Sequence, residues 1–193
     1  MFKIKTMNAI AAKGIAELTA EGCAVSADET APDALLIRSA KLHDAVFNDE
    51  LLCIGRAGIG VDNIPVERCT ADGIAVFNTP GANADSVKEL LLCALTMASR
   101  DIAGAVEWVK SLAPEGEKIP ALVEKGKNAF AGPEVSGKRL GVIGLGAIGS
   151  RVANAALQLD MEVSGYDPYL SVDSAWNLSS KVQHVTDLNA LFR

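Results

Sequence analysis

The sequence lacks an excess of basic residues and long hydrophobic runs, and its first residues do not have the pattern of a signal peptide. Its 193 residues include 18 Lys and Arg against 24 Asp and Glu, which gives a formal net charge of −6. This balance argues against a nucleic-acid partner, because a phosphate backbone is bound by clustered Lys and Arg. No apolar run approaches the ~20 residues that cross a bilayer, and the N-terminus is charged where a signal peptide would be apolar. We therefore expect no membrane association and a cytoplasmic location.

Histidines are also few, and no two cysteines have the spacing of a metal-binding or redox pair. The two histidines, His43 and His184, leave few candidates for a general base near neutral pH. The four cysteines lie in apolar stretches without C-x-x-C spacing, which favours small buried residues in a reducing compartment over metal ligands. What the chain does contain is 49% hydrophobic residues, enough for a substantial core.

Short apolar segments alternate with helical or glycine-rich segments along the first part of the chain. The first predicted strand, 2–6, is followed by a predicted helix over 10–18. Continuous apolar runs then predict three further strands, at 34–37, 51–54 and 74–77. Continuous rather than alternating runs are typical of parallel strands covered on both faces. These segments therefore indicate an α/β fold with a parallel sheet.

A long helix is expected after these strands. Ser86 and Glu89 have the spacing of a capping box, and an apolar stripe then continues towards Trp108. The following segment, 111–137, contains several prolines and glycines between short apolar pieces. This composition is typical of a connection between domains.

The second half of the chain contains one strand–helix–strand unit. Predicted strands at 139–143 and 161–166 flank a predicted helix over 148–159. Because a doubly wound dinucleotide-binding fold has about six strands, the sequence predicts only part of such a domain. We place the domain change near residue 100, so that the two domains are residues 1–99 and 100–193.

A glycine run at 144–149 joins this strand to this helix. Gly144 permits a tight turn, Gly146 lets the backbone approach a pyrophosphate, and Gly149 allows close packing of helix on strand. The helix N-terminus offers free N–H groups to a phosphate. Asp167, after the next strand, is expected to accept hydrogen bonds from the adenosine ribose and to repel a 2′-phosphate. We therefore predict NAD as the cofactor; the alternative is that the glycines serve packing alone.

A second glycine-rich segment, 55–63, follows the predicted strand at 51–54. Its glycines allow consecutive N–H groups to converge on an anion, and Arg56 adds a fork of donors suited to phosphate or carboxylate. Arg38 and Ser39 follow the neighbouring strand, at the sheet edge where ligands of parallel sheets bind. An anionic substrate is therefore predicted. The alternative is that both arginines are ordinary surface cations.

Five segments together resemble those of the D-isomer-specific 2-hydroxyacid dehydrogenases. They are residues 36–39, 55–64, 76–83, 140–149 and 165–168. The resemblance implies a flavodoxin-like substrate domain with a parallel sheet, followed by an incomplete NAD(P)-binding Rossmann domain. It also implies NAD-dependent oxidation of a small anionic substrate, 3-phosphoglycerate, to 3-phosphohydroxypyruvate, the first step of phosphorylated serine biosynthesis.

The resemblance further implies roles for individual residues. In the substrate site, Arg38 and Arg56 would face the phosphate, and Ser39 with the backbone from Gly58 to Gly60 would face the carboxylate. The residues implied to bind the cofactor are Thr79, near the nicotinamide, and Gly144, Gly146, Ala147, Ile148, Gly149 and Asp167.

The catalytic Arg, Glu and His of the family have no counterpart in this sequence, because His184 comes too early and lacks the surrounding motif. The resemblance thus implies the N-terminal half of such an enzyme, inactive by itself, whose full-length parent forms a homodimer. Two alternatives stay open. One is a dehydrogenase of another small D-2-hydroxy acid, and the other is a nucleotide-sensing, dehydrogenase-like binding module.

Overall fold

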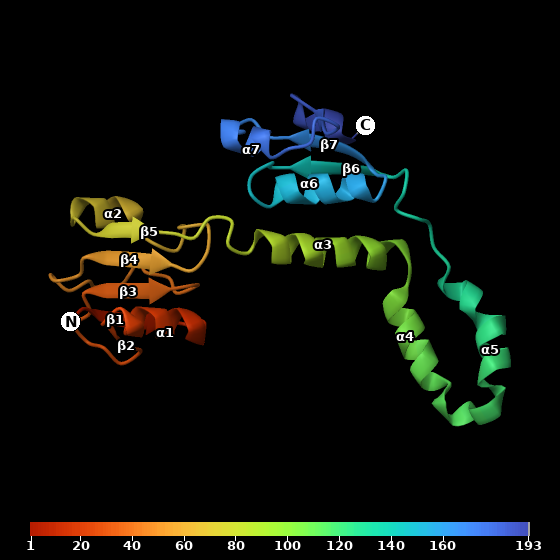
Figure 1. Cartoon of the computed structure of the whole chain (residues 1–193), viewed down its shortest axis with the longest axis horizontal. Helices are drawn as coiled ribbons and strands as arrows, with labels where there is room; N and C mark the ends of the chain where they lie inside the picture. The colour runs from red at the N-terminus through yellow and green to blue at the C-terminus, as the bar shows by residue number, and fades with distance from the viewer. Residues whose placement is uncertain (193) are drawn as a thin grey trace. The chain divides into compact units, whose positions relative to one another are not determined.

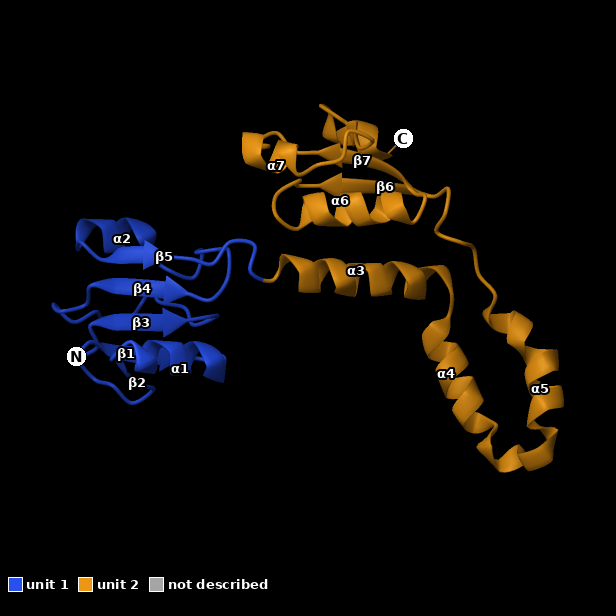
Figure 2. Ribbon diagram, in the orientation of Figure 1, with its two compact units in different colours: residues 1–82 blue, residues 83–193 orange. Residues whose placement is uncertain are grey.

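The computed structural model describes residues 1–192 and separates into two compact units, residues 1–82 and 83–193 (Figures 1 and 2). Each unit has α/β structure around a parallel sheet, as the sequence predicted. The division falls before helix α3 (Ala84–Ser99) because this helix packs against α6 (Gly149–Gln158) in the second unit. The predicted domain limits near residue 100 stay a prediction.

The first unit is built on a five-stranded parallel sheet in the order β2-β1-β3-β4-β5. Its strands are β1 (Lys3–Met7), β2 (Ala24–Ser26), β3 (Ala34–Ile37), β4 (Cys53–Arg56) and β5 (Ala75–Phe77). Its helices are α1 (Ala12–Ala20) and α2 (Val66–Ala71). Buried apolar side chains of the sheet, of α2 and of the loop after β3 form the core, among them Leu35, Ile37, Leu42, Ile54 and Cys69.

The register of this sheet brings three strand ends to one edge. Ile37 of β3 pairs with Arg56 of β4, and Gly55 of β4 pairs with Phe77 of β5. The predicted strand at 34–37 is confirmed, whereas β4 lies two residues later than the predicted strand at 51–54. Arg56 is therefore the last residue of the strand. The shift arises because Leu51 is buried in the core although it precedes the strand.

The second unit contains a three-stranded parallel sheet in the order β6-β7-β8. Its strands are β6 (Arg139–Ile143), β7 (Glu162–Tyr166) and β8 (Gln183–His184), accompanied by α6, α7 (Val172–Trp176) and η3 (Leu188–Phe192). The predicted strand–helix–strand unit is confirmed, and β8 is an additional short strand that the sequence did not predict. Val142, Leu145, Val152, Ala156 and Val163 lie in the core between sheet and helix.

The predicted long helix towards Trp108 was wrong, because the chain breaks between α3 and α4 (Ile102–Ser111). Arg100 is extended, with φ −147° and ψ 143°. The Asp101 side chain then accepts a hydrogen bond from the Gly104 N–H at 2.8 Å and caps the new helix. The predicted capping box at Ser86 was also wrong, since α3 has no side-chain cap.

The segment after α4 is more ordered than a plain connection. It contains η1 (Ala113–Lys118), α5 (Ile119–Gly126) and η2 (Lys127–Phe130). Pro120 lies in the first turn of α5, where a proline costs no hydrogen bond. The ring of Phe130 packs on Trp108 with centroids 5.1 Å apart. This contact pairs η2 with α4.

The cysteines are free, and their burial differs from the prediction. Cys69 is fully buried in the first core, but Cys93 is exposed on α3. Across residues 1–192, no helix combines the length and the apolar character needed to cross a bilayer.

Candidate functional site

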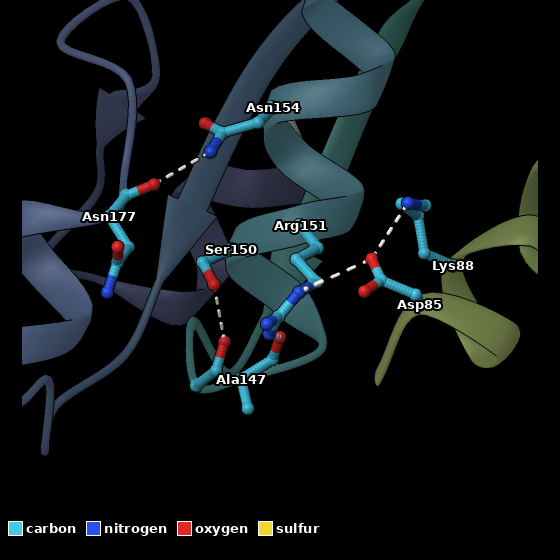
Figure 3. Close-up of polar contacts among 8 residues, drawn as sticks. Asp85, Lys88, Ala147, Ser150, Arg151, Asn154 and Asn177 are labelled. Atoms are coloured by element: carbon cyan, nitrogen blue, oxygen red, sulfur yellow. Dashed lines mark hydrogen bonds and ion pairs between the residues drawn. The ribbon is translucent and has the colours of Figure 1, made fainter. Parts of the chain in front are cut away.

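The predicted cofactor loop joins β6 to α6. It turns at Gly144, whose φ of +86° lies in the left-handed region that glycine adopts readily. The Gly144 N–H donates to the Tyr166 carbonyl at 2.8 Å, which ties the turn to the end of β7. In the first turn of α6, the Ser150 Oγ donates to the Gly146 carbonyl at 2.8 Å (Figure 3). The loop is thus fixed at both ends by local hydrogen bonds.

The glycines of this loop differ in what a side chain would meet. A Cβ at Gly149 would overlap the carbonyl oxygen of Gly144, so α6 reaches this position only with glycine there. A Cβ at Gly146 would have no atom within 4 Å. In the described chain, the N–H groups of Gly146, Ala147 and Ile148 donate to no acceptor. The loop therefore presents open space and free donors, which fits a pyrophosphate at the start of a helix.

Asp167 lies beside this loop, as its sequence position predicted, and it also holds the loop in place. Its Oδ2 accepts a hydrogen bond from the Leu145 N–H at 2.8 Å, and its Oδ1 accepts one from the Tyr169 N–H at 2.9 Å. A carboxylate offers about four acceptor positions. Each oxygen therefore keeps capacity for a ribose hydroxyl while the carboxylate fixes the backbone of the glycine run.

A surface ion pair reaches the same loop from α3. The Arg151 Nη1 donates to the Ala147 carbonyl at 2.7 Å, and its Nε lies 3.4 Å from the Asp85 Oδ1 (Figure 3). Lys88 donates to the same Asp85 oxygen at 2.8 Å, and this hydrogen bond lowers the pKa of the Asp85 carboxyl. Arg151 could not be predicted from local sequence, because its partner Asp85 lies on a different helix.

Further along α6, Asn154 ties the segment after α7 to the helix. Its Nδ2 donates to the Asn177 carbonyl at 2.7 Å, and its Oδ1 accepts from the Ser179 N–H at 2.9 Å (Figure 3). Figure 3 shows Asn154 directed towards Asn177 and away from Asp85. These contacts stabilise the helix that carries the loop without touching the loop itself.

The predicted substrate residues meet at the carboxyl edge of the first sheet. The half-buried Arg56 side chain folds back so that its Nε donates to the Arg38 carbonyl at 3.0 Å. Gly58 makes room for it, since a Cβ there would lie 2.5 Å from the Arg56 Nη1. Arg38 and Ser39 are exposed beside it. The first unit thus brings Arg38, Ser39 and the Arg56 side chain to one edge of the sheet.

The glycine-rich segment after β4 supplies backbone donors at this edge. In the described part of the chain, the N–H groups of Ile59 and Gly60 have no acceptor. The Ile59 carbonyl is held by the Asn78 Nδ2 at 2.7 Å, and the Gly58 carbonyl accepts from the Thr79 N–H at 3.0 Å. Thr79 is therefore fixed against the predicted substrate loop.

A small cavity lies at the same edge. It has a volume of about 110 Å³, and its lining is Leu36, Gly55, Arg56, Ala57, Phe77, Asn78 and Thr79. The lining is apolar except for the Arg56 guanidinium and the polar groups that follow β5. The cavity is smaller than a typical ligand pocket and mostly apolar, so it could accept only a small apolar part of a ligand.

Neither histidine has the partner that a general base requires. His43 and His184 are both exposed, and in residues 1–192 neither forms a hydrogen bond or ion pair with a carboxylate. The described residues also contain no cluster of three or more metal-ligating side chains. The chemistry that the described site supports is therefore the binding and orientation of anions.

Comparison with known proteins identifies the family. Residues 4–181 match the family described as the D-isomer specific 2-hydroxyacid dehydrogenase, catalytic domain. The chain belongs to this family of oxidoreductases.

Two named relatives match the chain over most of its length. The chain is 40% identical over 162 residues to a D-3-phosphoglycerate dehydrogenase of Methanocaldococcus jannaschii, a match that covers 82% of this chain and 28% of that protein. It is 42% identical over 139 residues to a hydroxypyruvate reductase of Thermotoga maritima, covering 70% of this chain and 42% of that protein. The chain therefore spans less than half the length of these relatives.

Solved structures share the fold. An NAD⁺-bound 3-phosphoglycerate dehydrogenase of Entamoeba histolytica aligns with 99% of this chain and 59% of its own, with a TM-score of 0.67 and 24% identity. An NADPH-dependent glyoxylate/hydroxypyruvate reductase of Sinorhizobium meliloti aligns with 99% of this chain and 60% of its own, with a TM-score of 0.77 and 18% identity. Proteins with this fold thus use either nicotinamide cofactor.

Proposed function

We propose that the chain supplies the substrate-anion loop and the cofactor loop of an NAD-dependent dehydrogenase that oxidises D-3-phosphoglycerate. The first unit would be its flavodoxin-like substrate domain, and the second unit the first part of its NAD(P)-binding Rossmann domain. The observation that supports the substrate is that Arg38 and Arg56 lie at the ends of neighbouring strands, where the Arg56 Nε donates to the Arg38 carbonyl. Two guanidinium groups suit a phosphate ester, which carries up to two charges, better than a lone carboxylate.

The choice of NAD rests on Asp167. Its carboxylate lies beside the glycine run, where it can accept hydrogen bonds from ribose hydroxyls and repels a 2′-phosphate. Gly146, Ala147 and Ile148 offer their N–H groups to the pyrophosphate. Bound there, NAD would supply the hydride acceptor for the carbon that carries the substrate hydroxyl. Thr79 would lie near the nicotinamide side of the substrate.

The same residues would bind and orient the substrate. Arg38 and Arg56 would hold its phosphate, while Ser39 and the N–H groups of Ile59 and Gly60 would hold its carboxylate. Loss of the general base alone typically costs 10²–10⁴-fold in rate. Because neither histidine has a carboxylate partner within residues 1–192, we propose that this chain binds both ligands without turnover.

The test is to measure the affinity of this chain for four ligands by calorimetry. We expect NADH to bind more tightly than NADPH, and 3-phosphoglycerate to bind about tenfold more tightly than D-glycerate, since a charge-assisted contact contributes ~1.5–3 kcal/mol. Equal affinity for 3-phosphoglycerate and D-glycerate would instead favour an unphosphorylated acid, as the likeness to the hydroxypyruvate reductase suggests. Tighter binding of NADPH would overturn the assignment of NAD.

We also propose that the protein forms a homodimer through α4. Ile102, Val106 and Val109 are exposed on this helix, and with Phe130 they line an apolar cavity of about 390 Å³. Exposed apolar surface of this kind is typical of an interface between protein chains. A two-fold axis would bring the same residues of two copies together.

The dimer proposal predicts that Val106→Glu gives a monomer. A carboxylate at each copy of this position would be desolvated and would repel its symmetry mate across the interface. Light scattering after gel filtration measures the mass. The matched control is Val172→Glu, which makes the same change at an exposed valine of α7. A wild-type mass of one chain, or a Val106→Glu variant that keeps the wild-type mass, would contradict the proposal.

A further inference from the structure

Asn8 follows β1 directly and lies at the edge where the predicted substrate residues gather. Met7, the last residue of β1, pairs with Ile37, so Asn8 comes level with Arg38. Its φ of +75° is in the left-handed region, which asparagine adopts more readily than most residues. A left-handed residue after a strand turns the chain sharply and re-aims its side chain. Here the side chain is directed at the segment 38–40.

One oxygen of Asn8 accepts hydrogen bonds from three consecutive backbone groups. Its Oδ1 lies 3.3 Å from the Arg38 N, 2.9 Å from the Ser39 N and 2.7 Å from the Ala40 N. Consecutive N–H groups that converge on one point form a nest, the backbone arrangement that proteins use to bind anions. In this protein a neutral amide oxygen fills the nest.

The carbonyl groups of the same segment are held from other strands and loops. The Arg56 Nε donates to the Arg38 carbonyl at 3.0 Å, and the buried Asn63 donates through its Nδ2 to the Ala40 carbonyl at 2.7 Å. The backbone of residues 38–40 is therefore fixed by side chains on both its donor and its acceptor groups. The side chains of Arg38 and Ser39 stay exposed.

We propose that Asn8 is a positioning residue for the substrate anion, an inference that rests on the function proposed above. By filling the nest, Asn8 reserves the anion for the Arg38 guanidinium and the Ser39 hydroxyl, and it fixes the backbone from which both side chains extend. Preorganisation of this kind raises affinity because less conformational freedom is lost on binding. The neutral amide supplies the acceptor without adding a negative charge beside the anion.

Two substitutions of Asn8 distinguish the role of its side-chain oxygen from the role of its left-handed backbone conformation. Asn8→Gly keeps a residue suited to positive φ and removes the acceptor, so it leaves three N–H groups without a partner. Asn8→Asp keeps an acceptor oxygen in the same place. Amide hydrogen exchange of Arg38, Ser39 and Ala40 by NMR reports on the segment, and calorimetry measures affinity for 3-phosphoglycerate and for inorganic phosphate. The affinity for NADH serves as the control, because its predicted loop lies in the second unit.

We expect Asn8→Gly to accelerate exchange at all three amides and to weaken binding of 3-phosphoglycerate about tenfold, with the affinity for NADH unchanged. Asn8→Asp should restore slow exchange and recover part of the affinity, since its added charge still opposes the anion. Unchanged exchange or unchanged affinity for 3-phosphoglycerate in Asn8→Gly would overturn the inference and leave the proposed function standing. A wild-type chain that binds NADH but neither anion would overturn the proposed substrate site, and the inference with it.

Discussion

Replacing Gly146 with alanine is expected to weaken NAD binding strongly while leaving the fold intact. A Cβ at this position meets no protein atom within 4 Å, and the φ of Gly146 is not in the left-handed region, so alanine should be accommodated without strain. The same methyl group would occupy the space that a pyrophosphate needs in order to approach the free N–H groups. We expect the dissociation constant for NADH to rise about 100-fold, which corresponds to ~2.7 kcal/mol.

The matched control is Gly149→Ala. This variant should lower the stability of the fold, whereas Gly146→Ala should lower only the affinity for NADH. A Cβ at Gly149 would overlap the Gly144 carbonyl oxygen, a backbone atom that cannot move aside without displacing the turn or the helix. Overpacking of this kind costs about 3 kcal/mol. Thermal unfolding followed by circular dichroism should show a clear loss of stability for Gly149→Ala and none for Gly146→Ala. A Gly146→Ala variant that binds NADH as the wild type does would show that the cofactor does not approach this loop.

Replacing Arg56 with alanine should weaken binding of 3-phosphoglycerate by roughly 10–100-fold, because a hydrogen bond to a charged group contributes ~1.5–3 kcal/mol. Two effects add. The anion loses one guanidinium group, and the Arg38 carbonyl loses the donor that helps to hold its segment. Arg56→Lys should recover only part of the affinity, since an ammonium group lacks the planar fork. Calorimetry with 3-phosphoglycerate measures the effect, and NADH again serves as the control.

Gly58→Ala tests the same contact without removing the arginine. Its Cβ would lie 2.5 Å from the Arg56 Nη1, so the guanidinium group has to move. The φ of +158° at Gly58 is one that residues with a side chain rarely adopt, so we expect some loss of stability together with a loss of anion affinity in the direction of Arg56→Ala. Wild-type affinity for 3-phosphoglycerate in both Arg56→Ala and Gly58→Ala would show that Arg56 does not contact the anion.

The elements that the sequence predicted well are those with a local cause. The glycine run predicted its strand and helix because each glycine meets a need of its own turn, whether a positive φ at Gly144 or close packing at Gly149. The strand at 34–37 was found because its apolar residues are continuous and bounded by polar ones. Such features depend only on neighbouring residues, so they can be inferred without the fold.

The features that the sequence did not predict depend on long-range or competing contacts. The apolar stripe of α3 continues past its end, and only the extended Arg100 and the capping side chain of Asp101 mark the break. The Asn8 contacts span 30 to 32 residues of sequence, and the Asp85–Arg151 ion pair joins two helices. No local pattern signals these pairs. The sequence therefore predicted which residues form the candidate site, but not the side chains that hold their backbone in place, such as Asn8 and Arg151.

The hydrogen bond between Asp167 and the Leu145 N–H has a consequence for how cofactor preference can change in this protein. The carboxylate proposed to select NAD is also part of the hydrogen-bonding that shapes the glycine run. A substitution that admits a 2′-phosphate also releases the N–H of a fully buried leucine, and an unpaired buried donor costs about 1–3 kcal/mol. A route to the other cofactor that passes through this position alone would therefore cross a less stable intermediate. The easier route first supplies another acceptor for Leu145 and only then removes the acid.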